Sequence, residues 1–379
     1  MVFRNRKSMF DRCKDYATTM FIFIVLHVVC GCSSARDAKP ISQLAISPDG
    51  NEFVFRYQPE HRESSLVRFN SSTGAIQILP QPLNEVWSNP TYSVDGKWLA
   101  IGVYAVNTQH SVQYTDSRID VMRSDGSGRR TVVPQDGLIK SLFRFSPDGK
   151  RLLFAEGSEG RLRPTGFTIH EVNLETLGVS AVVMANFYQL SSLAYFNRQF
   201  AYVGYAPQSY LDRQSPVPDK YIPTANDDQK TQWAMERNSM MYVTDARPEK
   251  LVPYVSFKTR ESSRSWQQND EIEELSIASK TNRMFVIMRH DDYPKDRDLR
   301  HYIRDVFEIN ANRTFRRLTF FNTVQFYGFD ATPDGRYVAV LPDNSDDPGR
   351  SATAIYRIDS INGEAKVFEP DLSKLSMPQ

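Results

Sequence analysis

A four-residue turn recurs along this chain and limits the folds available to it more than any other feature. Two copies read Ser47-Pro48-Asp49-Gly50 and Ser146-Pro147-Asp148-Gly149, and each is followed by an apolar stretch. Close variants begin at Ser93 and Thr332. Proline presets the backbone at the second turn position, aspartate suits the third, and glycine accepts the left-handed conformation at the fourth. Each copy therefore predicts a tight hairpin between two β-strands.

Two worn copies complete the series. In the segment 279–282, Asn282 stands where glycine is expected, and asparagine is the next residue most tolerant of positive φ. A shortened copy, 195–198, precedes another apolar strand. The turns start near 47, 93, 146, 195, 279 and 332, in steps of 46, 53, 49, 84 and 53 residues. A period of this size is typical of repeat architectures.

A second hairpin follows each turn, with arms such as Ile119–Met122 and Arg130–Val133. The glycines in the intervening turns are Gly74, Gly126, Gly178 and Gly363. Four strands per repeat of roughly 50 residues is the signature of a propeller blade. We therefore predict an all-β fold over residues 41–368, a six-bladed β-propeller of four-stranded antiparallel blades. Two stacked β-sandwiches are the alternative, but they do not require the same turn at one phase every time.

The repeat also resembles a known family. The turn with its following aliphatic strand, together with the arm from Ile119 to Thr131, is similar to the WD40-like repeat of TolB-type propellers. The resemblance covers nearly all of residues 41–368 and implies a fold, since one scaffold hosts many functions. The chain departs from TolB in leaving no room for its N-terminal α/β domain and in carrying a lipid-anchor motif. The resemblance therefore does not imply membership of the Tol-Pal system.

The N-terminus has the pattern of a signal peptide. Basic residues precede an apolar run, Ala17–Val29, that is short for a membrane span. The segment 29–33 resembles the bacterial lipoprotein signal, and this implies that Cys32 is lipidated and becomes the first mature residue. Ser33 then favours the outer membrane by the sorting rules of that class. Ordinary secretion with nearby cleavage and an uncleaved anchor are the alternatives.

The expected organisation is a lipoprotein signal peptide at 1–31, a tether at 32–40, the propeller at 41–368 and a C-terminal tail at 369–379. Cleavage before Cys32 removes the other cysteines, Cys13 and Cys30, so no disulfide within the mature chain is expected. We expect a monomer on the periplasmic side of the cell envelope, held at the membrane by its lipid.

Charge restricts the partners of the chain. Its 46 Lys and Arg residues nearly balance its 45 Asp and Glu residues, so the whole protein has no field that would attract nucleic acid. We predict no nucleic-acid partner.

Loop lengths suggest which face carries function. In a propeller, the first-to-second and third-to-fourth turns of every blade share one face, and the remaining connections share the other. The recurrent turns mark the face of short connections. The long irregular segments fall on the opposite face and are Tyr104–Ser117, Ala206–Asn238, Ser256–Glu274 and His290–Arg304. Long loops in compact domains are usually functional or disordered.

These segments supply the candidate binding residues, because partner surfaces favour aromatic side chains and arginine. The candidates are Tyr104, His110, Tyr210, Tyr221, Trp233, Trp266, His290, Asp291 and Asp292. Solvated insertions at 206–238 and 256–274 are the alternative interpretation. Residues 290–292 and His110 have the side chains of metal ligands, but no ligand spacing supports a site, and we predict no metal or other cofactor.

We find no catalytic motif: the chain has no G-x-S-x-G elbow, no H-E-x-x-H and no phosphate-binding glycine loop. Prolyl oligopeptidase-type peptidases carry similar propellers, but only eleven residues follow Phe368, too few for their hydrolase domain. Oligogalacturonate lyase also resembles this repeat, yet no set of its metal histidines can be matched. Carboxylates converging on the central channel remain an open alternative, since a closed ring brings distant loops together.

We predict a non-enzymatic binding or scaffold protein that engages a protein or cell-envelope component through its long-loop face. A carbohydrate-active lyase or hydrolase with its site at the channel mouth is the alternative. An enzyme needs acid, base or metal groups within reach of one substrate pose. A binding platform needs an exposed aromatic patch rimmed by polar groups.

Overall fold

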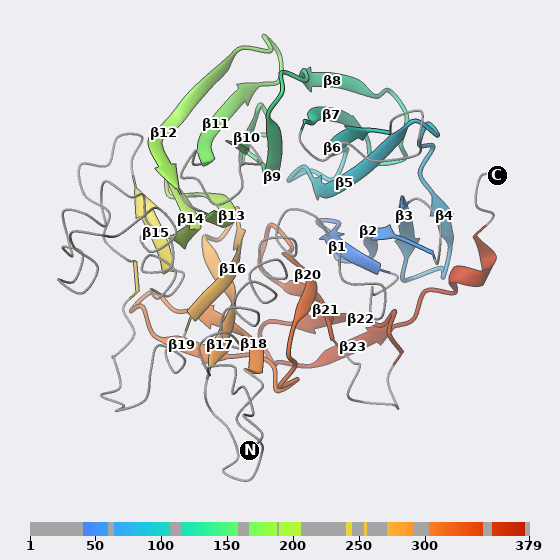
Figure 1. The fold of residues 1–379 in the computed structure, drawn as a ribbon. Helices are drawn as coiled ribbons and strands as arrows, with labels where there is room; N and C mark the ends of the chain where they lie inside the picture. Colours follow the sequence, from blue (N-terminus) through green and yellow to red (C-terminus); the bar gives the residue numbers. More distant parts are fainter. Residues whose placement is uncertain are drawn as a thin grey trace, which may run out of the picture.

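The protein is described by a computed structural model. It describes residues 41–59, 64–106, 116–157, 167–187, 189–205, 240–244, 254–255, 271–290, 303–343 and 351–375. Within these residues the strands form six antiparallel sheets arranged around a central axis, as Figure 1 shows. The predicted all-β, six-bladed propeller is confirmed.

Each blade is formed by consecutive strands. Blade 1 consists of β1 (Ile41–Ile46), β2 (Glu52–Tyr57), β3 (Ser65–Asn70) and β4 (Ile76–Ile78). Blade 2 consists of β5 (Glu85–Tyr92), β6 (Trp98–Ala105), β7 (Arg118–Arg123) and β8 (Arg130–Val133). Blade 3 consists of β9 (Ile139–Phe145), β10 (Arg151–Gly157), β11 (Phe167–Asn173) and β12 (Val179–Phe187).

Blade 4 consists of β13 (Gln189–Phe196), β14 (Gln199–Tyr205) and β15 (Met240–Thr244). Blade 5 consists of β16 (Glu271–Ala278), β17 (Arg283–His290), β18 (Ile303–Ile309) and β19 (Phe315–Arg317). Blade 6 consists of β20 (Phe326–Ala331), β21 (Tyr337–Pro342), β22 (Ile355–Asp359) and β23 (Ala365–Phe368). The fourth arm expected for blade 4, at 250–252, lies outside the described residues.

The recurrent turns have the same hydrogen bonds in four of the blades. Between β1 and β2, Ser47 Oγ donates to Asp49 Oδ1 at 2.5 Å, and the Gly50 amide donates to the Ser47 carbonyl at 2.9 Å. The amides of Asn51 and Glu52 donate to Asp49 Oδ1 and Ser47 Oγ. Equivalent bonds occur in the turns that begin at Ser93, Ser146 and Thr332. The corners therefore mark one structural position.

The two less regular copies of the turn also connect the first and second strands of their blades, but with different turn geometries. Asn282 has a φ of 57°, as its place in the motif predicts, and its amide donates to the Ala278 carbonyl at 2.7 Å. The hydrogen bond that closes this turn joins residues four apart, Ala278 and Asn282. In the recurrent turn it joins residues three apart, Ser47 and Gly50. In blade 4 the loop shrinks to Asn197 and Arg198, both with positive φ, as in a two-residue hairpin.

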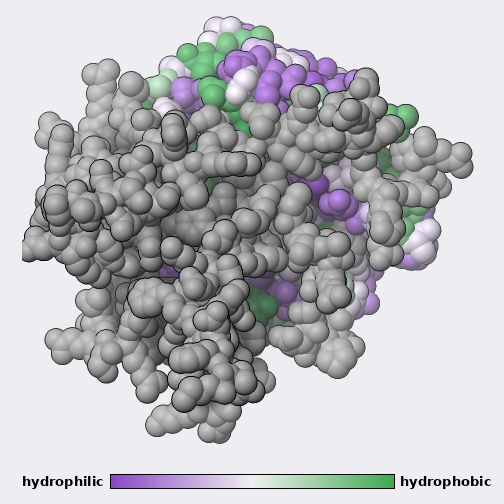
Figure 2. Space-filling view, in the orientation of Figure 1, coloured by the Kyte–Doolittle hydropathy of each residue, from purple (hydrophilic) through white to green (hydrophobic). Residues whose placement is uncertain are grey.

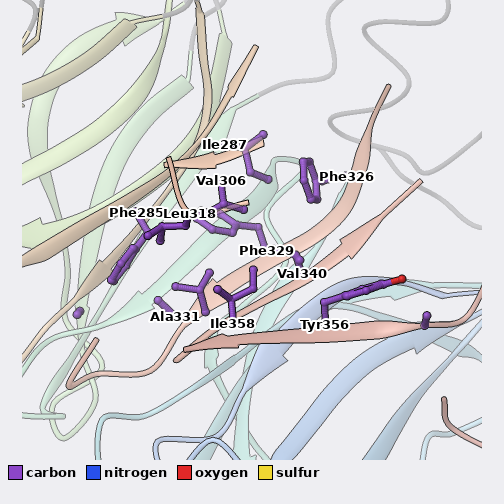
Figure 3. Close-up of a cluster of buried hydrophobic side chains, with 13 residues drawn as sticks. Phe285, Ile287, Val306, Leu318, Phe326, Phe329, Ala331, Val340, Tyr356 and Ile358 are labelled. Atoms are coloured by element: carbon purple, nitrogen blue, oxygen red, sulfur yellow. The ribbon is translucent and has the colours of Figure 1, made fainter. Parts of the chain in front are cut away.

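The first strand of every blade lies nearest the axis and contacts the first strands of its neighbours (Figure 1). Apolar side chains fill the spaces between blades. Figure 3 shows this packing between blades 5 and 6, where Phe285 and Val306 face the cluster that contains Phe329, Val340 and Ile358. Each sheet thus buries its faces against neighbouring sheets, as expected of a propeller.

The ring closes by packing between blades 6 and 1, without an exchanged strand among the described residues. Ile41 and Phe53 of blade 1 share one apolar cluster with Leu341 and Phe368 of blade 6. The Arg357 guanidinium of blade 6 also donates to the carbonyl of Gly50 at 2.5 Å.

The predicted tail begins with an ordered contact. A short 3₁₀ helix, η2 (Leu372–Lys374), follows β23, and Leu372 and Leu375 pack onto the cluster between blades 6 and 1. Residues 376–379 lie outside the described residues.

Three of the predicted long segments are shorter than expected. Glu271–Glu274 belongs to β16, and Ile303 and Arg304 belong to β18, because their backbones continue the pairing with β17. Likewise Tyr104 and His290 are strand residues. The segments still leave and rejoin the sheets at strand ends opposite the recurrent turns.

Apolar residues are dispersed over the described surface. The exposed large apolar side chains are Leu83, Leu177, Val179, Phe320, Ile361 and Val367. They come from several blades, and Figure 2 shows hydrophilic and hydrophobic residues intermixed over the described part of the upper edge. The described residues alone therefore do not form the exposed aromatic patch that a binding platform requires.

Candidate functional site

The innermost strands share an irregularity that faces the central axis. Pairing with the second strand slips once in each of β1, β5, β9, β13, β16 and β20. At three of these bulges a residue other than glycine has positive φ: Gln43 (55°), Asn89 (50°) and Leu142 (58°). Bulges re-aim side chains and are common next to functional sites. The axis is therefore where the repeat departs from regular sheet geometry.

Charged side chains from opposite blades meet across this axis. Arg144 lies on β9 of blade 3, and its Nη2 is 4.0 Å from Asp330 Oδ1 on β20 of blade 6. Blades 3 and 6 face each other in a six-membered ring, so this pair spans the channel. The Arg144 side chain is 27% exposed and that of Asp330 is 12% exposed, which places the pair below the molecular surface.

Asp330 also holds neighbouring blades together. Its Oδ2 accepts from the amide of Ile46 in blade 1 at 3.2 Å, and its Oδ1 accepts from Ser276 Oγ in blade 5 at 3.2 Å. Ser276 Oγ in turn accepts from the amide of Ala331 at 3.1 Å. Burial raises the pKa of Asp330 above its ordinary value, although the charge of Arg144 and these hydrogen bonds oppose the shift.

A second group of charges lies in blade 5. Arg304 donates from Nε to Glu273 Oε2 at 2.5 Å and from Nη2 to Glu273 Oε1 at 2.7 Å, a bidentate pair. The same guanidinium donates to the carbonyl of Val324. Burial raises the pKa of the adjacent Glu274 to about 7, and the charge of Glu273 adds to this rise, while Arg144 and Arg304 oppose it.

We name Arg144, Glu273, Glu274, Arg304 and Asp330 the axial cluster. Its members come from three blades: Arg144 and Asp330 approach each other across the ring, and the charges of Glu273, Arg144 and Arg304 act on Glu274. A carboxyl with a pKa near 7 can exchange a proton at neutral pH, which is the property required of a general acid or base. The chemistry available to the cluster is therefore proton exchange and pairing with a charged group.

Sequence reasoning did not select this cluster. Arg144 stood inside an arm otherwise made of Leu and Phe, and Asp330 stood between Phe329 and Ala331. A charged residue within an otherwise apolar innermost strand is the sequence feature that could have identified these positions. Glu273 and Glu274 fall within the predicted irregular segment Ser256–Glu274, whereas the structure places them in β16.

The structure places two predicted binding residues in the interior. Tyr104 is 2% exposed and His290 is 4% exposed. His290 Nε2 lies 3.2 Å from Asp305 Oδ2, and its ring packs edge-on against Phe307. Asp305 also accepts from Arg317 at 2.6 Å and from Thr319 at 2.7 Å. These contacts tie β17, β18 and the chain after β19 together.

The other predicted site residues lie outside the described residues. They are Cys32, His110, Tyr210, Tyr221, Trp233, Trp266, Asp291 and Asp292. Within the described part of the chain, no group of three or more His, Cys, Asp or Glu side chains could hold a metal ion. The described residues also contain no helix long and apolar enough to cross a membrane.

No protein-family model and no curated protein matches this chain. Solved structures do match it. A protein assigned as TolB from Agrobacterium tumefaciens is 13% identical, with 81% of this chain and 92% of that chain covered and a TM-score of 0.51. An oligogalacturonate lyase in complex with manganese is 11% identical, with 87% and 79% covered and a TM-score of 0.51. TolB from Acinetobacter baumannii is 13% identical, with 96% and 70% covered and a TM-score of 0.48.

At such identities the likeness concerns the fold alone. The predicted resemblance to TolB-type propellers is confirmed at that level, and this chain has a TolB-like propeller fold. A lyase has the same architecture, so the fold alone does not discriminate between the two predicted functions.

Proposed function

We propose that this chain is a binding or scaffold propeller of the bacterial cell envelope, which engages a protein or another envelope component through the face opposite the recurrent turns. One observation carries the proposal. The turn face is built from short corners with the same hydrogen bonds, whereas the long segments begin and end on the other face. A rigid ring that presents variable connections on one side suits recognition.

The contacts of the axial cluster support a binding role. Glu273 is held by Arg304 in a bidentate pair, and Asp330 accepts from Ile46 and Ser276 across two blade boundaries. Glu273 is thus tied within blade 5, and Asp330 links blade 6 to blades 1 and 5, so both carboxyls serve the structure of the ring.

The binding face is tested by photo-crosslinking in cells. A photoreactive amino acid is placed at Trp233 or Trp266 in the long segments, and at Thr73 or Asn362 on the turn face as matched controls. We expect a discrete crosslinked species from the first pair and none from the second. Discrete crosslinks from the turn-face positions alone would contradict the proposed face.

Attachment to the membrane is a separate part of the proposal. The lipoprotein-like motif supports an anchor at Cys32 and an outer-membrane location facing the periplasm, and the protein is proposed to be a monomer. Cys32→Ser is expected to move the protein from the membrane fraction to the soluble periplasmic fraction. Unchanged fractionation would rule out the lipid anchor and leave the binding face untouched.

A carbohydrate-active lyase or hydrolase is the second candidate. The observation that favours it is Glu274, whose pKa of about 7 suits proton transfer in the channel. The similar fold of an oligogalacturonate lyase suggests the substrate to try, with and without manganese. Turnover that Glu274→Gln abolishes would establish the enzyme. We expect none, and crosslinking then stands as the test of the binding role.

A further inference from the structure

The chain enters the propeller at the inner edge of the face opposite the recurrent turns, which we call the long-loop face. β1 is the first strand of blade 1 and lies next to the axis (Figure 1). Ile41 pairs with Tyr57 at one end of β1, and Ile46 pairs with Phe53 at the other end, beside the turn that begins at Ser47. Ile41 therefore lies on the long-loop face, and the chain before it is attached there.

The length of that preceding chain limits where a lipid on Cys32 can reach. Residues 32–40 are nine residues, and an extended chain spans at most about 3.6 Å per residue, so their reach is roughly 32 Å. The route from Ile41 round the rim to the turn face crosses the four strands of blade 1, about 14 Å, and then follows a six-residue strand such as β2, about 20 Å. Side chains lengthen this route further, so the lipid falls short of the turn face.

The shorter route, along the central axis, is obstructed. Arg144 of blade 3 and Asp330 of blade 6 approach to 4.0 Å from opposite sides of the ring. Asp330 is fixed in this place by the Ile46 amide and by Ser276 Oγ, each at 3.2 Å. A polypeptide backbone cannot pass between side chains that lie this close together. The lipid therefore stays on the side of the long-loop face or at the rim.

We propose that residues 32–40 hold the long-loop face toward the membrane that carries the lipid, and that the partner of this face is a protein embedded in the same membrane. The proposal rests on the anchor at Cys32 and on the binding face proposed above. The tether keeps its point of attachment within about 30 Å of the bilayer. It also raises the effective concentration of any partner held in that bilayer, which favours such a partner over one in solution.

Paired charges on the long-loop face favour a protein partner over the lipid surface itself. Anionic headgroups attract clusters of Lys and Arg. Five basic side chains at the described strand ends of this face have carboxylate partners within the protein. The pairs are Arg118 with Glu85, Lys140 with Asp136, Arg289 with Glu271, Arg304 with Glu273, and Arg317 with Asp305. These five side chains therefore add no net positive charge that would hold the face on anionic headgroups.

Orientation is tested by fluorescence quenching of the lipidated protein in vesicles of phosphatidylethanolamine and phosphatidylglycerol. Cleavage before Cys32 leaves this acylated cysteine alone in the mature chain, so an introduced cysteine is a unique labelling site. Labels are placed at Leu83 and Phe320, 68% and 72% exposed in connections on the long-loop face, and at the exposed Thr73 and Ile361 of the turn face as matched controls. We expect a nitroxide on the headgroups to quench the first pair severalfold more than the second. Equal or stronger quenching on the turn face would overturn the proposed orientation.

A longer tether tests whether residues 32–40 set this orientation. Insertion of about 20 Gly and Ser residues after Ser34 adds a flexible segment with an end-to-end distance of about 25 Å. The lipid can then pass the rim, and we expect the difference in quenching between the two faces to fall severalfold. An undiminished difference would contradict the tether as its cause.

The lipid surface is tested as the partner with the Cys32→Ser protein, which lacks the anchor. We expect this protein to remain in solution when it is mixed with the same vesicles and the vesicles are sedimented. Cosedimentation would assign the long-loop face to lipid headgroups and would overturn the protein partner.

The partner itself is tested on the crosslinked species that Trp233 or Trp266 gives in cells. A protease site introduced between residues 32 and 40 releases the propeller from its lipid after crosslinking. Free propeller should then leave the membrane fraction, whereas the crosslinked species should stay there through an alkaline wash. A crosslinked species that the protease releases would overturn the embedded partner and leave the binding face in place. Absence of any crosslink would contradict the binding face and its partner together, but not an orientation measured by quenching.

Discussion

Leu177 occupies a backbone position that belongs to glycine in the equivalent turns of blades 1 and 6. Its φ is 60°, and its amide donates to the Asn173 carbonyl at 2.8 Å. Gly74 and Gly363 make the same bond in blades 1 and 6, with φ of 72° and 76°. Left-handed backbone costs a residue with a Cβ roughly 1–2 kcal/mol. Blade 3 therefore carries a local strain that the turns of blades 1 and 6 avoid.

We predict that Leu177→Gly stabilises the protein by about 0.5 kcal/mol. Relief of the left-handed conformation outweighs the added freedom of glycine in the unfolded chain, which offsets about 0.5–1 kcal/mol. Leu177 is 44% exposed, so little packing is lost. The measurement is the free energy of urea unfolding.

The reverse change at the equivalent turn is the control. Gly74→Ala is expected to destabilise by about 1 kcal/mol, although a Cβ there would meet no atom within 4 Å, because the strain lies in the backbone alone. Equal effects of the same sign in both variants would contradict this account of the turn.

The strands β1 and β20 form the boundary where the ring closes, and their bulges bring them into close contact. A Cβ on Gly328 would lie 2.7 Å from Leu44 Cβ and 2.8 Å from the Leu44 backbone nitrogen. Backbone atoms cannot rotate away as a flexible side chain can. The innermost strands at this boundary are therefore in contact without spare room.

We predict that Gly328→Ala destabilises the protein by about 1–3 kcal/mol, as overpacking does, because β1 must move away from β20. The Ile46 amide should exchange faster with solvent in this variant, since its acceptor is Asp330 on β20. Gly178→Ala is the control: its Cβ would meet only Thr176 Oγ1 at an ordinary 3.5 Å, so stability should change by less than about 0.5 kcal/mol. A stable Gly328→Ala protein with unchanged exchange at Ile46 would contradict tight closure.

The pH dependence of the whole ring combines two opposing sets of carboxyls. Hydrogen bonds from Ser or Thr hydroxyls and backbone amides hold the pKa of Asp49, Asp95, Asp148 and Asp334 below 3.8, against the effect of burial. Such groups stabilise the fold above their unfolded pKa, and this stabilisation is lost as the pH falls through the folded value. Glu274 acts in the other direction, because its folded pKa lies above its unfolded one.

We predict a free energy of unfolding that drops below about pH 4 and also falls as the pH rises from about 5 to 8. In the second range the unfolded chain has released the Glu274 proton and the folded chain releases it only near pH 7. Glu274→Gln should flatten that range, and Asp148→Asn should reduce the acid drop. Urea unfolding at fixed temperature across this pH range is the measurement. Stability that rises from pH 5 to 8 would contradict the prediction.

Much of the fold could be predicted because its signals are local. The turn at Ser146 needs only its own proline, aspartate and glycine, and its neighbours complete the hydrogen bonds within six residues. Repetition of that turn at a nearly constant period implies equivalent sheets, which cannot bury their faces except against one another. The strand boundaries at Glu271 and Ile303 were less accurate, because charged residues in those strands had the composition of a loop.

The sequence by itself determined the recurrent hairpins, the number of blades and the face on which the short turns lie. Only the tertiary structure decided that Arg144 meets Asp330, because that contact depends on how many blades close the ring and on the bulges that aim each innermost strand. It also placed Tyr104 and His290 in the interior, since burial depends on neighbouring strands that are distant in the chain. A turn is fixed by the chemistry of adjacent residues, whereas an axial contact is a property of the closed ring.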